Sequence, residues 1–146
     1  MAAETPAART STGEALSPSE AGALATDIKR WARALGLSEC RITDTELAEH
    51  ETHLLNWLDA GFHGEMEWMA RHGTRRSRPA ELVPGTLRIV SVRLDYFPPE
   101  ARDPWAVLAD PTLAYLSRYA LGRDYHKVLR RRLQRLAERI AARVGP

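Results

Sequence analysis

The sequence predicts an α/β (α+β) fold: the front part of a mixed-sheet domain with flanking helices, incomplete at its C-terminus. Two amphipathic helices, one near each end of the chain, supply the helical part. The β-branched, apolar run of residues 87–94 is typical of a strand that is covered on both faces. Only residues 40–43 offer a second strand, so we expect partner strands outside these 146 residues.

The first helix has clear start and stop signals. Residues 1–16 are small and polar and are predicted to be a disordered tail, with the folded domain over 17–146. Ser17-Pro18-Ser19-Glu20 places Ser at the N-cap, Pro at the first helical position and Glu three residues after the cap, which is a capping box. Gly36 supplies the stop. The apolar face of this helix recurs at steps of four, three and four residues: Leu24, Ile28, Trp31 and Leu35.

A second helix is expected after the short strand. Residues 43–46 (Thr-Asp-Thr-Glu) repeat the capping-box pattern and predict a helix that reaches about Ala60. A shorter helix is predicted over 65–72, and the basic segment 75–84 is typical of a turn-rich connection. The expected inner side of the second helix consists of Leu47, Leu54, Leu55 and Leu58.

The C-terminal part is predicted to be a loop followed by a long helix. Residues 98–112 are rich in Pro and Asp and indicate a loop. The last helix is expected over about 124–143. Its expected inward side chains are Val128, Leu129, Leu133, Leu136, Ile140 and Val144.

Charge is distributed unevenly along the chain. From Arg118 to Pro146 there are nine basic and two acidic residues, a net charge of +7, whereas the whole chain carries +2 and the remainder therefore −5. Such asymmetry points towards an anionic partner for the C-terminal part, but from charge alone a solvated helix face is the better interpretation.

Several functional classes find no support. No run of about 18 apolar residues or signal-peptide core exists, so we expect no membrane partner. The single cysteine, Cys40, is interpreted as a small buried hydrophobe, and cytoplasmic localisation is expected. His50 and His53 share a helix face, but a zinc site needs three or four ligands, so no metal-binding residue is predicted.

Two segments are dense in functional residue types. Residues 61–69 hold two glycines, a histidine, two carboxylates and two large rings, and periodicity favours a helix–loop–helix corner with the apolar side chains in the core. Residues 117–127 crowd polar and aromatic groups into a turn before a helix N-terminus, which attracts anions. A capped turn, with Asp124 as N-cap, Arg123 on the surface and Tyr119 in the core, explains this second segment equally well.

Taken together, these segments resemble a known family. Residues 61–71 read Gly-Phe-His-Gly-Glu-Met-Glu-Trp-Met-Ala-Arg, Arg78-Pro79 leads through Leu-Val-Pro-Gly to the strand, and residues 117–127 follow. In order and spacing they are similar to the amino-terminal domain of tRNA epoxyqueuosine reductases, from roughly Ala23 to the end of the chain. The resemblance predicts an oxidoreductase of queuosine biosynthesis that removes the epoxide oxygen of epoxyqueuosine at the tRNA wobble position.

The resemblance also implies cofactors and site residues. It implies cobalamin and, in the full-length protein only, two [4Fe–4S] clusters that this chain does not bind. Arg78 matches a position expected to approach the corrinoid. The family's active-site segment, expected to border the corrinoid and the modified base, matches Arg118, Tyr119, Arg123, Asp124, Tyr125 and His126.

The chain also departs from the family pattern. The proton-donating Asp of the family is expected beyond Pro146, so no catalytic residue is assigned here. The cluster cysteines and tRNA-binding repeats are expected further on as well; Cys40 is not one of them, and Arg41 stands where a small residue is usual. We therefore expect this chain alone to be inactive, and the full-length protein to bind tRNA as a monomer with an unidentified reductant. The alternatives are a small basic nucleic-acid-binding protein without catalytic activity, and another corrinoid or flavin reductase.

Overall fold

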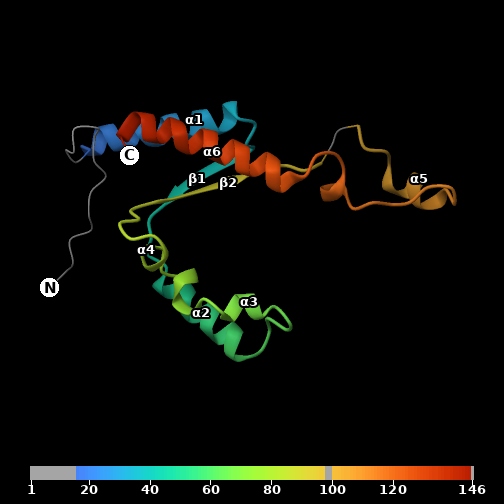
Figure 1. Ribbon diagram of the computed structural model, residues 1–146, viewed down its shortest axis with the longest axis horizontal. Helices are drawn as coiled ribbons and strands as arrows, with labels where there is room; N and C mark the ends of the chain where they lie inside the picture. Colours follow the sequence, from blue (N-terminus) through green and yellow to red (C-terminus); the bar gives the residue numbers. More distant parts are fainter. Residues whose placement is uncertain (1–15, 98–99, 146) are drawn as a thin grey trace. The chain divides into compact units, whose positions relative to one another are not determined.

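The computed structural model describes residues 16–97 and 100–145, and it combines helices with a small two-stranded antiparallel sheet (Figure 1). The predicted mixed α/β fold is confirmed. Apart from Leu16, the predicted disordered tail lies outside the described residues. The expectation of one truncated cobalamin-binding domain over 17–146 stays a prediction.

The chain divides into two compact units, which are described separately. The middle unit consists of residues 42–90, and the outer unit combines the described residues before 42 with those after 90. The elements in chain order are α1 (Pro18–Ala34), β1 (Glu39–Thr43), α2 (Ala48–Asp59), α3 (Glu67–Ala70), the 3-10 helix η1 (Gly73–Arg76), α4 (Pro79–Leu82), β2 (Ile89–Arg93), α5 (Pro104–Ala109), the 3-10 helix η2 (Arg118–Ala120) and α6 (Tyr125–Val144).

Helix α1 of the outer unit begins and ends as predicted. The Ser17 side chain accepts a hydrogen bond from the Glu20 backbone N–H, and the Glu20 carboxylate accepts one from the Ser17 N–H at 2.9 Å. Gly36 follows the helix with φ +75°, and the Arg132 guanidinium donates to its carbonyl at 2.7 Å. A Cβ at Gly36 would lie 3.1 Å from Arg132 Nη1, so both the backbone angle and the close approach require glycine.

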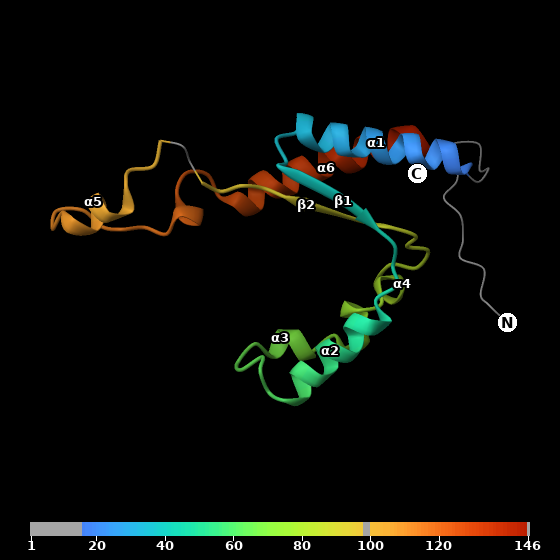
Figure 2. The same cartoon turned by 180° about the vertical axis from the view of Figure 1, so that it is seen from behind.

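Helices α1 and α6 lie side by side in both views (Figures 1 and 2). Ile28 and Ala32 of α1 and Leu136 of α6 are buried, so these helices supply most of the small core. Leu133, predicted to face inward, is 37% exposed. Its stripe of α6 is distinct from the one that includes Leu136, and it lines a shallow surface hollow together with Tyr125.

Strands β1 and β2 pair with each other, and the Ser38 N–H donates to the Arg93 carbonyl at 2.9 Å beside the pairing. Cys40 is buried, but every residue of β2 is half-buried or exposed. In the part of the chain that the structure describes, a two-stranded sheet with few flanking elements does not bury this strand. Cover on both faces was expected to need partner strands outside these 146 residues, so it stays a prediction.

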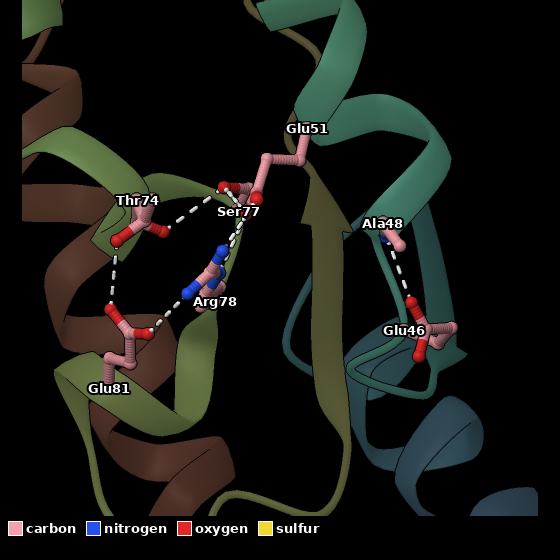
Figure 3. Close-up of polar contacts among 7 residues, drawn as sticks. All are labelled: Glu46, Ala48, Glu51, Thr74, Ser77, Arg78 and Glu81. Atoms are coloured by element: carbon pink, nitrogen blue, oxygen red, sulfur yellow. Dashed lines mark hydrogen bonds and ion pairs between the residues drawn. The ribbon is translucent and has the colours of Figure 1, made fainter. Parts of the chain in front are cut away.

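Helix α2 of the middle unit begins later than predicted. The Asp44 carboxylate accepts from the Glu46 N–H at 3.1 Å. The Glu46 carboxylate accepts from the Ala48 N–H at 2.9 Å (Figure 3). A capping box at Thr43 would need the Glu46 side chain, which is used in this turn, and the helix starts at Ala48. Leu55, predicted on the inner side, is 38% exposed.

The remaining short helices also differ from the sequence expectations. The predicted helix over 65–72 is only the four-residue α3, and η1 and α4 form within the segment expected to be turn-rich. The predicted loop contains α5, because Asp103 caps it by accepting from the Ala106 N–H and Pro104 starts its first turn. Among the described residues no helix has the length and apolar character needed to cross a membrane.

Candidate functional site

The turn before α6 in the outer unit is built by η2 and a capped helix start. Arg118 opens η2, and Gly122 follows with φ +84°, a conformation that glycine adopts easily. Asp124 is the N-cap of α6, as predicted: its carboxylate accepts from the His126 N–H at 2.9 Å. These hydrogen bonds hold the pKa of Asp124 below its usual value, so it is ionised at neutral pH.

Three rings of this segment pack together. Tyr119 meets Tyr125 edge-on with ring centroids 6.1 Å apart, and Tyr125 stacks on His126 at 3.9 Å. Tyr119 is 54% exposed, so the interpretation that it belongs to the core is wrong. With Tyr96 and two leucines, Tyr119 and Tyr125 line a hollow of about 400 Å³. The rings thus form an open aromatic wall rather than a packed core.

His126 is oriented by the same carboxylate that caps the helix. Its Nδ1 lies 3.1 Å from Asp124 Oδ1. Because an ionised carboxylate can only accept, Nδ1 carries the proton and Nε2 is left as the second polar atom of the ring. The segment therefore presents one histidine in a defined tautomer.

Arg118 is the most unusual side chain of the segment. Its guanidinium lies over the Phe97 ring, 4.1 Å from the centroid. Its Nη1 is buried and has no hydrogen-bond partner among the described residues. It also lines a hollow of about 220 Å³ together with residues such as Arg102 and Tyr115. A buried donor without a partner is costly, so Arg118 is the side chain of this segment best placed to donate to a ligand.

Arg123 is the one predicted residue of this segment without a specific role in the geometry. It is exposed and makes no hydrogen bond or ion pair within the described ranges 16–97 and 100–145. The structure therefore brings Tyr119, Asp124, Tyr125 and His126 into contact, places Arg118 on Phe97 and leaves Arg123 in solvent.

Arg78 belongs to the middle unit, where it is the centre of a polar network (Figure 3). It donates from Nε and Nη2 to the two oxygens of Glu51 at 2.9 and 2.8 Å, and from Nη1 to Glu81 at 3.1 Å. The buried Ser77 hydroxyl donates to Glu51 at 2.6 Å, and the Thr74 hydroxyl donates to Glu81 at 3.0 Å. The network thus links α2 to η1 and α4 through charge-assisted hydrogen bonds.

The network has a clear electrostatic signature. The hydrogen bonds from Arg78 and then Ser77 lower the pKa of Glu51 from its ordinary 4.5 to about 2. Arg78 and Thr74 lower the pKa of Glu81 in the same way, and the two carboxylates raise the pKa of Arg78. All three groups are therefore charged at neutral pH.

Sequence reasoning missed several of these residues. Glu51 and Ser77 lie 26 positions apart, and nothing in their local pattern predicts that they meet. Tyr96 and Phe97 follow the strand without a motif and were also missed. The apolar side chains of residues 61–69 were expected in the core, yet Phe62 is 71% and Trp68 is 52% exposed. Trp68 instead packs its ring against the Arg76 guanidinium, 5.1 Å away.

The part of the chain that the structure describes holds no cluster of potential metal ligands. No group of three or more His, Cys, Asp or Glu side chains gathers there in a way that could hold a metal ion. His50 and His53 lie on α2, as expected for residues of the second helix.

Comparison with known proteins points to the same segments. Residues 76–146 match the family described as Epoxyqueuosine reductase QueG, DUF1730. The chain is 62% identical to the epoxyqueuosine reductase of Pseudomonas aeruginosa over 131 residues. The aligned region covers 90% of this chain and 36% of that protein. The predicted resemblance to the epoxyqueuosine reductase family is confirmed.

Other epoxyqueuosine reductases match similarly. The Vibrio cholerae enzyme is 57% identical over 122 residues, 84% of this chain and 33% of that protein. The Escherichia coli enzyme is 54% identical over 123 residues, 84% of this chain and 32% of that protein. The chain thus spans about a third of the length of these relatives. No solved structure is significantly similar to it.

Proposed function

We propose that this chain is part of an epoxyqueuosine reductase, and that the turn before α6 forms one wall of its cobalamin site. The observation that carries the proposal is the buried Nη1 of Arg118, which has no hydrogen-bond partner among residues 16–97 and 100–145. It lies in the same segment as an open aromatic hollow, within the residues that match the epoxyqueuosine reductase family. A stand-alone nucleic-acid-binding protein is disfavoured, because 90% of the chain is accounted for by similarity to a reductase.

The residues present fit a corrinoid. A corrinoid is a flat macrocycle with carboxamide groups at its rim, so it needs apolar contact for the ring and hydrogen-bond donors for the amides. Tyr119 and Tyr125 offer exposed ring surface together with hydroxyl donors, and Arg118 offers the unpartnered N–H. When bound, the corrinoid would supply the redox chemistry needed to remove an epoxide oxygen.

The chain's own residues would bind and orient. Arg118 is held in place by Phe97, and Asp124 fixes the ring of His126 so that Nε2 can exchange a proton or hydrogen bond with a neighbouring group. The family's proton-donating Asp is expected beyond Pro146, so no catalytic residue is assigned in this chain. The approach of Arg78 to the corrinoid stays a prediction; its three nitrogens already hold two carboxylates.

The residues present do not fit iron–sulfur clusters. Each cluster needs four thiolates, and Cys40 is the single cysteine of the chain. Burial raises the pKa of the Cys40 thiol, which disfavours the thiolate that a metal requires. The clusters are therefore expected in the longer protein outside these residues, and tRNA and cytoplasmic localisation are likewise proposed for that protein.

The test is to express the complete reading frame and to measure conversion of epoxyqueuosine to queuosine in tRNA by mass spectrometry. Conversion by the purified protein, with corrinoid absorbance retained, is the expected result. Tyr125→Phe removes the hydroxyl and His126→Phe removes the ring nitrogens; a lost hydrogen bond is worth about 0.5–1.5 kcal/mol, so conversion should fall by up to about tenfold in each variant. Absence of corrinoid from the protein would contradict the proposal, and retained corrinoid without conversion would point instead to another corrinoid reductase.

A further inference from the structure

A further hollow lies in the outer unit between α1 and β1, and its lining is more polar and charged than that of the aromatic hollow. Its volume is about 430 Å³, and all of its lining residues belong to this unit. The lining consists of Lys29 and Arg33 from α1, Ser38 from the connection, Glu39, Cys40 and Arg41 from β1, and Arg93 from β2.

The lining is strongly positive. Four cationic side chains and one carboxylate line the hollow, so the lining carries a net charge of +3, and Asp95 beside it pairs with Arg93 at 3.2 Å. Glu39 is shared, since it accepts from Arg41 at 2.7 Å and from Arg93 at 3.3 Å. This sharing holds the two guanidiniums at the rim and leaves most of their N–H groups free to bind another acceptor. Arg41 remains 79% and Arg93 62% exposed, so both are accessible.

The positive charges of Lys29 and Arg33 on α1 are less neutralised by carboxylates than those of Arg41 and Arg93. Lys29 and Arg33 are four residues apart and so share one face of α1. Within the described ranges, neither has a carboxylate within ion-pair distance, whereas the neighbouring Arg30 is paired with Asp27 at 2.7 Å. Both cations act to lower the pKa of the Cys40 thiol, which also lines the hollow, although burial raises this pKa more.

We propose that this hollow binds phosphate groups of the tRNA backbone, an inference that rests on the proposed function for its RNA partner. Arginine forks and lysine ammonium groups are the usual protein ligands of phosphate. The same unit carries the net charge of +7 between residues 118 and 146, and such a field attracts a polyanion more strongly than a single small anion.

The test is binding of a fluorescent RNA hairpin to the product of the complete reading frame, followed by anisotropy at several salt concentrations. The double variant Lys29→Gln, Arg33→Gln should bind about tenfold more weakly than the unmodified protein. The slope of log affinity against log salt concentration should become less steep by about 1–2, because fewer counterions are released when fewer phosphates are contacted.

The matched control is Arg30→Gln, compared with the single variant Arg33→Gln. Both remove one positive charge from α1, but Arg30 is already neutralised by Asp27 and does not line the hollow. We expect Arg33→Gln to weaken hairpin binding and Arg30→Gln to leave it within about twofold. Thermal melts identical to the unmodified protein show that each variant is folded.

The outcomes separate this inference from the proposed function. Unchanged affinity and salt slope in the double variant, or an equal loss in Arg30→Gln, would overturn the phosphate site even if epoxyqueuosine is converted. A loss confined to the hollow variants would support the site even if no conversion occurs. Millimolar inorganic phosphate could also compete with the hairpin while the salt slope stays the same in all variants. That result would assign the hollow to free phosphate and overturn the RNA contact.

Discussion

Two arginines in this molecule show how differently the same side chain can be used. In the middle unit, Arg78 has a carboxylate oxygen opposite each of its three nitrogens. In the outer unit, Arg118 lies on an aromatic ring and keeps one buried nitrogen without a partner among the described residues. The hydrogen bonds of Arg78 connect elements of its own unit, whereas Arg118 keeps a donor that its described surroundings do not use. The comparison supports a structural contribution from Arg78 and agrees with the ligand-binding role proposed for Arg118.

The largest effect on stability is expected from Arg78→Ala. The substitution leaves Glu51, whose side chain is only 17% exposed, without its bidentate partner, and it disconnects α2 from η1 and α4. We expect the melting temperature to fall by several degrees, because an isolated, poorly hydrated carboxylate is costly. Differential scanning calorimetry measures this. Arg75→Ala, an exposed arginine of the neighbouring η1, is the control, and an equal loss there would contradict the structural role of Arg78.

Gly36→Ala tests the turn after α1 in the outer unit, where Gly36 lies against Arg132 of α6. The positive φ should cost about 1–2 kcal/mol of unfolding free energy, and the new methyl group would press on Arg132. Gly22→Ala is the matched control, because Gly22 lies within α1 and a methyl group there would meet nothing within 4 Å. That change should stabilise the protein by about 0.5–1 kcal/mol. Urea unfolding distinguishes the two, and a loss of the same size at both positions would show that Gly36 is not special.

A smaller effect concerns acid. The pKa of Glu51 is lowered from 4.5 to about 2, so its contribution to stability is complete above about pH 4.5 and is lost as the pH falls towards 2. Unfolding free energy measured between these pH values should decline. Glu51→Gln should flatten the decline, since the amide does not titrate in this range. An equally steep decline in Glu51→Gln would place the acid sensitivity elsewhere.

Local signals in the sequence correctly predicted the helix ends that are capped by residues close in sequence. Ser17 and Glu20 form their capping box and Asp124 caps α6, because these interactions involve residues only a few positions apart. The second predicted capping box, at residues 43–46, does not start α2, because Asp44 and Glu46 make polar turns that compete with it. Burial was predicted less well: Leu55 and Leu133 are exposed, because whether an apolar face is covered depends on which other elements pack against it.

The candidate site followed the same pattern. The resemblance and the crowding of residue types identified the turn at Arg118–His126, and the structure shows that Tyr119, Tyr125 and His126 are in contact. The contribution of Phe97 could not be read from the sequence, because it comes from a segment 21 positions away. The Glu51–Arg78 pair was hidden for the same reason, at a separation of 27 positions.

The most direct measurement compares corrinoid retention in Arg118→Ala and Arg123→Ala, made in the product of the complete reading frame. Both substitutions remove one arginine from the same segment, but only Arg118 has a buried nitrogen without a partner in the described residues. Absorbance of the purified proteins should show at least about tenfold less bound corrinoid in Arg118→Ala, with Arg123→Ala close to the unmodified protein. Equal retention by the two folded variants would contradict the claim that this turn forms a wall of the cobalamin site.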